Sequence, residues 1–134
     1  MNPFNYKRRE SSETKIGNTP LGGSNPIRVQ SMTNTNTNDT ENSVEQIIRI
    51  VEAGGDYVRL TAQGVREAEN LRNIKDEVRK RGYTTPLIAD IHFNPRAAFA
   101  AAQVVEKVRI NPGNFVDRAK SFQTFEYTDE EYAQ

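Results

Sequence analysis

Four short apolar segments recur along this sequence, and segments with helical character separate them. The centres of the apolar segments lie at Val29, Val58, Ile88 and Val108, about 30, 30 and 20 residues apart. Strands that alternate with helices at such intervals form parallel βαβ units, because each helix carries the chain back to the start of the next strand. The sequence therefore predicts an α/β protein built around a parallel sheet.

The amino-terminal part combines a polar tail, a turn and a first strand. Residues 1–13 predict a flexible tail, and Thr14–Gly23 contains the Gly-Asn and Gly-Gly pairs that are typical of a short β-hairpin. Pro26–Met32 is rich in apolar residues and predicts a strand. The polar segment Thr33–Thr40 predicts a loop with almost nothing to bury, more typical of a mobile loop than of a binding element.

Apolar residues at helical spacing mark two helices with recognisable ends. The first is predicted to begin within Asp39–Ser43, where Ser43 and Gln46 fit a capping box, and to end at Gly54-Gly55. The second is predicted to end at Gly82. The apolar stripes consist of Val44, Ile47, Ile48 and Val51 in the first helix and Ala68, Leu71, Ile74 and Val78 in the second.

Three more strands and a third helix complete the alternation. The strands are predicted at Asp56–Thr61, Pro86–Ile91 and Glu106–Ile110. Asn94-Pro95 begins the third helix, because Asn caps a helix and Pro fits its first turn, and the small residues of Ala97–Val105 continue it.

A parallel (β/α)8 barrel of the TIM type explains this order better than a doubly wound sheet. A doubly wound sheet usually has a glycine-rich turn after its first strand, whereas the first loop here has no glycine. A TIM barrel takes about 250 residues, so residues 14–134 are expected to supply its first half, about four β/α units. Thr128–Gln134 then indicates the first turns of a further helix. A half barrel has two open sheet edges, which favour self-association.

The composition excludes several kinds of protein. The chain has 18 Lys and Arg against 18 Asp and Glu, so its net charge of zero predicts no general attraction to nucleic acid or a membrane. It has no Cys, which excludes a disulfide, a thiolate nucleophile and a Cys-ligated metal within these residues. Because neither a secretory signal nor an apolar run of about 20 residues occurs, we expect a cytoplasmic location.

Two arginines lie where barrel enzymes place their active sites, at the carboxyl ends of the strands. Arg59 and Arg109 are inside apolar runs, where an unpaired guanidinium group is unfavourable. Together they could form a clamp for phosphate. Alternatively, each pairs with an internal carboxylate such as Asp90, or points outward between the helices.

Further groups at the strand ends are candidates for the same site. Asp90 could orient an arginine, accept a substrate hydroxyl, act as a base or make only a structural hydrogen bond. His92, the only histidine, fits a structural or a functional role equally and has no partners at metal-ligand spacing. The turn Asn111–Asn114 is either an anion-binding nest or a plain Pro-Gly turn, and the capped helix start at Asn94 is another potential anion site. No residue is assigned as catalytic, and no metal site is predicted.

Three motifs at the strand ends resemble one enzyme family. They are Val29–Thr35 (VQSMTNT), Ile88–Pro95 (IADIHFNP) and Lys107–Asn114 (KVRINPGN). In this order they closely resemble the N-terminal domain of the 4-hydroxy-3-methylbut-2-enyl diphosphate synthase family, the iron–sulfur enzymes of the methylerythritol phosphate route to isoprenoids. The resemblance spans Lys15–Asn114, and Ala62–Ala68 is further similar to the longer, three-domain form of the family.

The resemblance implies an oxidoreductase whose barrel binds 2-C-methyl-D-erythritol 2,4-cyclodiphosphate. It further implies a separate domain with a [4Fe–4S] cluster, and ferredoxin or flavodoxin as the donor of the two electrons that open the ring and remove a hydroxyl. By motif, Arg59 and Arg109 would grip the diphosphate, and Asp90, His92 and Asn111 would line the pocket. The chain departs from the family in having no cysteine, so the resemblance implies a substrate-binding part that is inactive alone.

Two other interpretations stay open at this point. A different TIM-barrel enzyme could bind a phosphorylated or pterin-like ligand, because barrels host many chemistries. Alternatively, the chain is a non-catalytic half barrel that works by association through its open edges.

Overall fold

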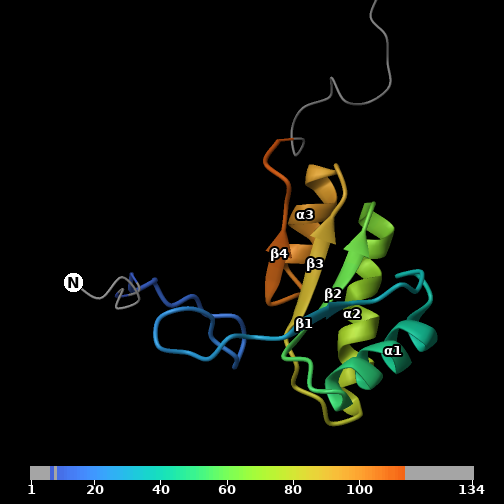
Figure 1. Ribbon diagram of the computed structural model, residues 1–134. Coiled ribbons are helices and arrows are strands. Elements are labelled where there is room, and N and C mark those ends of the chain that lie inside the picture. The colour runs from blue at the N-terminus through green and yellow to red at the C-terminus, as the bar shows by residue number, and fades with distance from the viewer. Residues whose placement is uncertain (1–6, 8, 114–134) are drawn as a thin grey trace, which may run out of the picture.

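The computed structural model describes residue 7 and residues 9–113, and it confirms the predicted alternation of strands and helices (Figure 1). Four strands pair in parallel, in the order β1-β2-β3-β4, and a helix joins each strand to the next. The elements are β1 (Gln30–Met32), α1 (Thr40–Glu52), β2 (Tyr57–Ala62), α2 (Val65–Lys80), β3 (Leu87–Ile91), α3 (Pro95–Ala102) and β4 (Lys107–Arg109).

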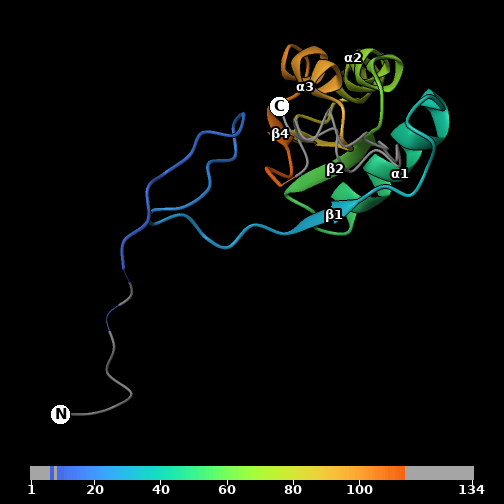
Figure 2. The ribbon, with the colours of Figure 1, turned by 90° about the horizontal axis from the view of Figure 1, so that it is seen from above.

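The three helices cover one face of the sheet and follow one another around its outer side (Figure 2). α1 packs against α2, α2 packs against α3, and the main core lies between the helices and the strands. This arrangement is a partial (β/α) barrel, as the sequence predicts. None of the described helices is both long and apolar enough to cross a membrane. The strands contribute Val58, Leu60, Ala62, Leu87, Ala89 and Ile91 to this core, and α2 contributes its whole predicted stripe.

The opposite, inner face of the sheet has a smaller core at the amino ends of its strands. Tyr57 and Ile88 alternate with residues of the main core, so they lie on the face away from the helices. Ile16 and Leu21 of the amino-terminal turn pack against them. The Tyr57 hydroxyl donates a hydrogen bond to the carbonyl oxygen of Thr19. The amino-terminal turn therefore closes this end of the inner face.

The predicted hairpin is reduced to one antiparallel bridge. Thr14 and Leu21 exchange both backbone hydrogen bonds, with N···O distances of 2.7 and 2.9 Å. Gly17 lies in the turn between them with a φ of 55°, in the left-handed region that glycine adopts without strain. The turn is stabilised by burial against the sheet more than by pairing within itself, so its flanks do not extend into regular strands.

β1 is shorter than the strand predicted over Pro26–Met32. Gln30 is its first residue opposite β2, where it pairs with Tyr57. Upstream of that point Ile27 and Val29 are 88% and 57% exposed. Apolar composition predicted the longer strand, but a ladder of hydrogen bonds requires a partner along its whole length.

The Thr/Asn-rich loop between β1 and α1 is firmly bonded to its neighbours. Thr33 and Thr37 are buried. The Thr37 hydroxyl donates to the carbonyl oxygen of Thr61 at 2.6 Å, and the Thr37 carbonyl oxygen accepts from Asn70 Nδ2 at 2.7 Å. The expectation that this loop has almost nothing to bury is therefore wrong. The side chain of threonine is small enough to be buried here, and its hydroxyl can form a hydrogen bond with the backbone, as Thr37 does.

The predicted capping box at the start of α1 is also wrong. The helix begins three residues before Ser43, and Asp39 caps it. Ser43 is buried within the helix and donates to the carbonyl oxygen of Asn36 at 3.1 Å. Gln46 forms two hydrogen bonds of 2.9 Å with Asn34. Both polar side chains thus hold the preceding loop instead of capping their own helix.

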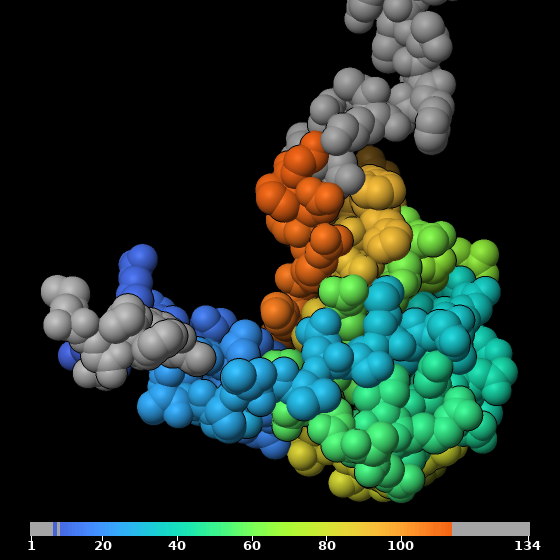
Figure 3. All heavy atoms as spheres, viewed as in Figure 1, coloured from blue at the N-terminus to red at the C-terminus, as the bar shows by residue number. Residues whose placement is uncertain are grey.

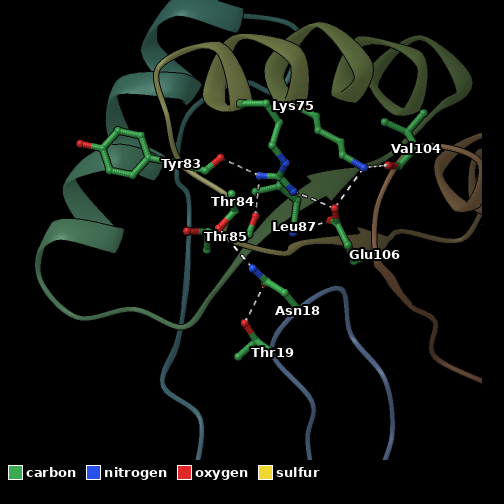
Figure 4. A network of polar contacts seen from close by, with 10 residues as sticks. Asn18, Thr19, Lys75, Tyr83, Thr84, Thr85, Leu87, Val104 and Glu106 are labelled. Carbon is green, nitrogen blue, oxygen red and sulfur yellow. Dashed lines mark hydrogen bonds and ion pairs between the residues drawn. The ribbon is translucent and has the colours of Figure 1, made fainter.

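A cluster of charged groups fastens α2 to the amino ends of β3 and β4 (Figure 4). Glu106 Oε1 lies 3.0 Å from Lys75 Nζ and 2.7 Å from Arg79 Nη2, and Glu106 Oε2 accepts from the backbone N–H of Leu87 at 2.8 Å. Burial, the largest single influence, raises the pKa of Glu106. The Leu87 N–H and the Lys75 ammonium together outweigh it, so the pKa lies below its ordinary value.

Candidate anion-binding site

The carboxylate of Asp90 is the centre of a group of polar side chains from β2, from β3 and the turn after it, and from β4. Asp90 and Arg109 lie near the carboxyl ends of their strands, whereas Arg59 is the third of the six residues of β2 and not at the strand end that the sequence predicts. Its Oδ1 accepts from Arg109 Nη1 at 3.1 Å, and its Oδ2 lies 3.7 Å from Arg59 Nε and 3.3 Å from His92 Nε2. The Asp90 side chain is only 6% exposed, whereas the side chains of its partners are 30–46% exposed. We call these four residues the Asp90 cluster; they are four of the five predicted site residues.

The register of the strands brings the cluster together. Thr61, Asp90 and Arg109 are neighbours in one row across the three strands. Arg59 precedes Thr61 by two residues and therefore lies on the same face. That face is the inner one, because Leu60 packs in the core on the helix side. Figure 3 shows this part of the molecule with all heavy atoms as spheres. Orange atoms of β4 and cyan atoms of the loop after β1 lie on either side of green and gold atoms, which belong to segments between them in the sequence.

The charges of the cluster do not balance. Both arginines pair with Asp90, so the interpretation of internal ion pairs is confirmed, and neither points outward between the helices. Two guanidinium groups against one carboxylate nevertheless leave one positive charge in excess, even with His92 neutral. Such a local excess attracts anions although the whole chain is neutral.

Arg59 has an unused hydrogen-bond donor. Its Nη2 donates to Met32 Sδ at 3.5 Å, a weak acceptor. Its Nε is buried and finds no hydrogen-bond acceptor among the described residues, because Asp90 Oδ2 is too distant at 3.7 Å. A buried donor without an acceptor is unfavourable.

His92, Phe93 and Asn94 make the sharp turn from β3 into α3. The backbone N–H of His92 donates to Ala62 at 3.1 Å, which extends the pairing of β2 with β3. Phe93 has a φ of 61°, and the centroid of its ring lies 5.7 Å from that of the His92 imidazole. Asn94 caps α3, as predicted, by accepting from the N–H of Arg96 at 3.0 Å. The imidazole therefore contacts both the charged cluster and an aromatic ring.

Asn111 lies apart from the Asp90 cluster, in the exposed turn after β4. Its Oδ1 accepts from the backbone N–H of Gly113 at 3.0 Å, which removes one donor from the predicted anion nest. Asn114, the last residue of that turn, lies outside the described residues, as does the helix start predicted at Thr128–Gln134. The role of Asn111 as a substrate ligand stays a prediction.

Two hollows on the described surface lie elsewhere. They have volumes of about 330 and 280 Å³ and open over α1 and α2, not at the strand ends. No residue of the Asp90 cluster lines either of them. The first hollow is lined by Asn38, Arg66, Glu69, Asn70 and Asn73, and the second by Glu45, Ile48, Arg49 and Arg81.

A comparison with protein families decides which kind of barrel carries this cluster. A model of the GcpE TIM-barrel domain matches residues 11–133. The chain belongs to the GcpE family. The resemblance of the three strand-end motifs is thereby confirmed.

Curated relatives of this GcpE chain bear the name of one enzyme. A Phocaeicola vulgatus protein named 4-hydroxy-3-methylbut-2-en-1-yl diphosphate synthase (flavodoxin) is 69% identical over 134 residues. Proteins of the same name from Bacteroides thetaiotaomicron and Leptospira interrogans are 67% and 50% identical over 134 and 132 residues. These matches cover 98–100% of this chain but 20–22% of the relatives. The chain therefore spans about a fifth of the length of the relatives it matches.

The residues of this GcpE chain do not fit an iron–sulfur cluster. The 134 residues include no cysteine, and the described part has no group of three His, Asp or Glu side chains that could hold a metal ion. Thiolate ligands for such a cluster would have to come from outside this chain.

Two further residues of the strand ends, neither of them predicted as a site residue, lie beside the Asp90 cluster. Met32 contacts Arg59, and Thr61 lies in the same row as Asp90. Both are at or beside the carboxyl end of a strand, and that position was the one signal available for them. Arg59 and Arg109 were recognised because each is a charged residue inside an apolar run. Met32 and Thr61 are uncharged, so they lack this feature.

Proposed function

We propose that this chain is the amino-terminal, substrate-binding part of a 4-hydroxy-3-methylbut-2-enyl diphosphate synthase, an oxidoreductase of isoprenoid biosynthesis. In this proposal the Asp90 cluster binds the diphosphate group of 2-C-methyl-D-erythritol 2,4-cyclodiphosphate. The observation that carries the proposal is the pair of arginines that share one buried carboxylate on the inner face of a GcpE barrel. The names of the relatives support the reaction.

Arg59 and Arg109 are proposed to bind the phosphate oxygens. Both side chains are partly exposed, so both can reach a ligand. Guanidinium groups suit this role because they keep their charge and present several N–H donors in a fixed plane.

Asp90 is proposed to position the arginines and to leave contact with the phosphates to them. Its carboxylate is buried and would repel an anion. Because one oxygen holds Arg109 and the other faces Arg59, the carboxylate sets the separation and direction of the two guanidinium groups before a ligand arrives.

His92 and Asn111 are proposed to line the same pocket. His92 is supported by its contact with Asp90 and by a side chain that is 37% exposed. Asn111 is supported by its place in the strand-end motif, two residues after Arg109.

The reductive chemistry is assigned to other parts of the enzyme. Because this chain has no cysteine, the [4Fe–4S] cluster belongs to a part of the enzyme beyond it. The relatives' names include flavodoxin, which supports flavodoxin as the electron donor and leaves ferredoxin as the alternative. The chain alone is expected to bind substrate at most, and its cytoplasmic location stays a prediction.

A chimeric enzyme tests this proposal. These 134 residues would replace the matching segment of the Phocaeicola vulgatus synthase, which is 69% identical. We expect the chimera to convert the cyclodiphosphate with reduced flavodoxin, and a chimera with Arg59→Ala and Arg109→Ala together to lose substrate binding. A chimera that folds and carries its cluster, yet neither binds nor converts the cyclodiphosphate, would overturn the proposal.

A further inference from the structure

Phe93 combines backbone strain with an exposed ring. Its φ of 61° lies in the left-handed region, which bulky residues rarely adopt because their Cβ approaches the backbone too closely. Its side chain is 66% exposed, so burial of the ring offsets little of that strain. The sharp turn from β3 into α3 requires this backbone conformation but not a bulky side chain, so a phenylalanine at this strand end indicates a functional role.

The ring adjoins the Asp90 cluster. It is tilted by 36° against the His92 imidazole at a centroid distance of 5.7 Å, and His92 Nε2 lies 3.3 Å from Asp90 Oδ2. An apolar surface and an anion-binding surface therefore meet at the end of β3.

Phe99 shows that exposure alone does not explain Phe93. It is 71% exposed on α3, in ordinary helical conformation, and single exposed apolar residues are common on protein surfaces. Phe93 differs from Phe99 in its strained backbone and in its contact with a residue of the cluster.

We infer that the Phe93 ring is a specificity-determining contact for the carbon skeleton of the ligand whose phosphates the arginines bind. This inference rests on the proposed function. The ligand class is a diphosphate ester with a short, branched, partly apolar carbon chain. Inorganic pyrophosphate offers similar phosphate groups without a carbon skeleton, so it can occupy the arginines but cannot use the ring.

The test compares two ligands on variants of the chimeric enzyme, with dissociation constants measured by calorimetry. Phe93→Gly removes the ring and relieves the strain, because glycine adopts positive φ freely. We expect the cyclodiphosphate to bind about tenfold more weakly, as loss of a modest apolar contact implies. Pyrophosphate affinity should stay the same, and the midpoint of thermal unfolding should not fall. Phe93→Tyr should restore cyclodiphosphate binding, and Phe99→Ala should leave both affinities unchanged.

Three outcomes would overturn the inference. Unchanged cyclodiphosphate affinity in Phe93→Gly would show that the ring does not touch the ligand. Equal losses for both ligands would show that Phe93 acts on the anion site through His92. A lower unfolding midpoint with both affinities reduced would show a role in folding. If Phe93→Gly does not fold, Phe93→Asn replaces it, since Asn also tolerates this conformation.

A separate variant distinguishes failure of the inference from failure of the proposed function. Arg109→Ala should weaken the binding of both ligands. If it does so while Phe93→Gly has no effect, only the inference fails. If Arg109→Ala changes neither affinity, the proposed anion site itself is wrong.

Discussion

Arg109 and Asp90 are register partners on β4 and β3, and Arg109 Nη1 lies 3.1 Å from Asp90 Oδ1. A slip of β4 by one residue would turn Arg109 to the helix side, because successive side chains of a strand point to opposite faces. The same pairing that builds the sheet therefore also builds the Asp90 cluster.

Replacing Arg109 by Ala is expected to weaken binding of the cyclodiphosphate to the chimeric enzyme. The loss should be about 1.5–3 kcal/mol, the range for a hydrogen bond to a charged group. Calorimetric titration measures it, with Arg72→Ala, an exposed arginine of α2, as the control. An unchanged dissociation constant would contradict the role of Arg109.

Replacing Asp90 by Asn keeps the shape of the side chain and removes its charge. The two guanidinium groups then lose their shared partner, and we expect the enzyme to be less stable by about 1–3 kcal/mol. Substrate affinity should also fall, because the arginines lose their fixed positions. Urea unfolding and titration give the two quantities, with Asp76→Asn on the exposed face of α2 as the control. Stronger substrate binding by the variant would refute a positioning role for Asp90.

Glu106 should make stability depend on pH in the acidic range. Its pKa is lowered in the folded protein, so its contribution is fully present above the ordinary carboxyl pKa and is lost as the pH falls through the lower, folded pKa. At pH 7, Glu106→Gln should cost about 1–3 kcal/mol, because Lys75 and Arg79 lose their shared partner. Unfolding experiments from pH 7 downward should show the difference between wild type and variant shrinking below about pH 4. A constant difference across this range would argue against the prediction, and Glu69→Gln on the surface is the control.

Thr37→Val tests the attachment of the loop between β1 and α1. The variant keeps the volume of the side chain but removes the hydroxyl that donates to Thr61 at 2.6 Å. We expect a loss of about 1 kcal/mol in stability, and more if the Thr61 carbonyl is left without a partner. Asn38→Ala, at an exposed position of the same loop, should have little effect. Equal thermal midpoints for Thr37→Val and wild type would show that the hydrogen bond is unimportant.

The isolated 134-residue chain is expected to self-associate. In the described sheet β1 and β4 each pair on one side only, and unpaired strand edges readily bind other strands. Light scattering over a range of concentrations measures the molar mass. A constant monomer mass would show that the edges are covered.

Most of the fold could be predicted because it depends on local patterns. The stripe of α2 is buried as its spacing indicates, and Asn94 caps α3 as residue type suggests. Properties that depend on distant partners could not be predicted. The length of β1 depends on where Tyr57 lies, and the true role of Ser43 depends on the path of the preceding loop.

Four of the five residues predicted for the site come together in the structure, but the geometry of the group could not be predicted. Arg59 and Arg109 could be recognised because a charged side chain inside an apolar strand is unfavourable unless it is paired. That one carboxylate serves both follows from the register of three strands, which no local pattern specifies. The left-handed backbone of Phe93 was also invisible, since nothing about a phenylalanine predicts positive φ.

The closure of the inner face by the amino-terminal turn has a consequence for synthesis on the ribosome. Ile16 and Leu21 pack against Ile88, which is translated much later. These two apolar side chains therefore wait, without their partner, until β3 has left the exit tunnel. Contacts of such sequence separation form slowly, so the turn that carries Ile16 and Leu21 is expected to reach its final place late, although it is made early.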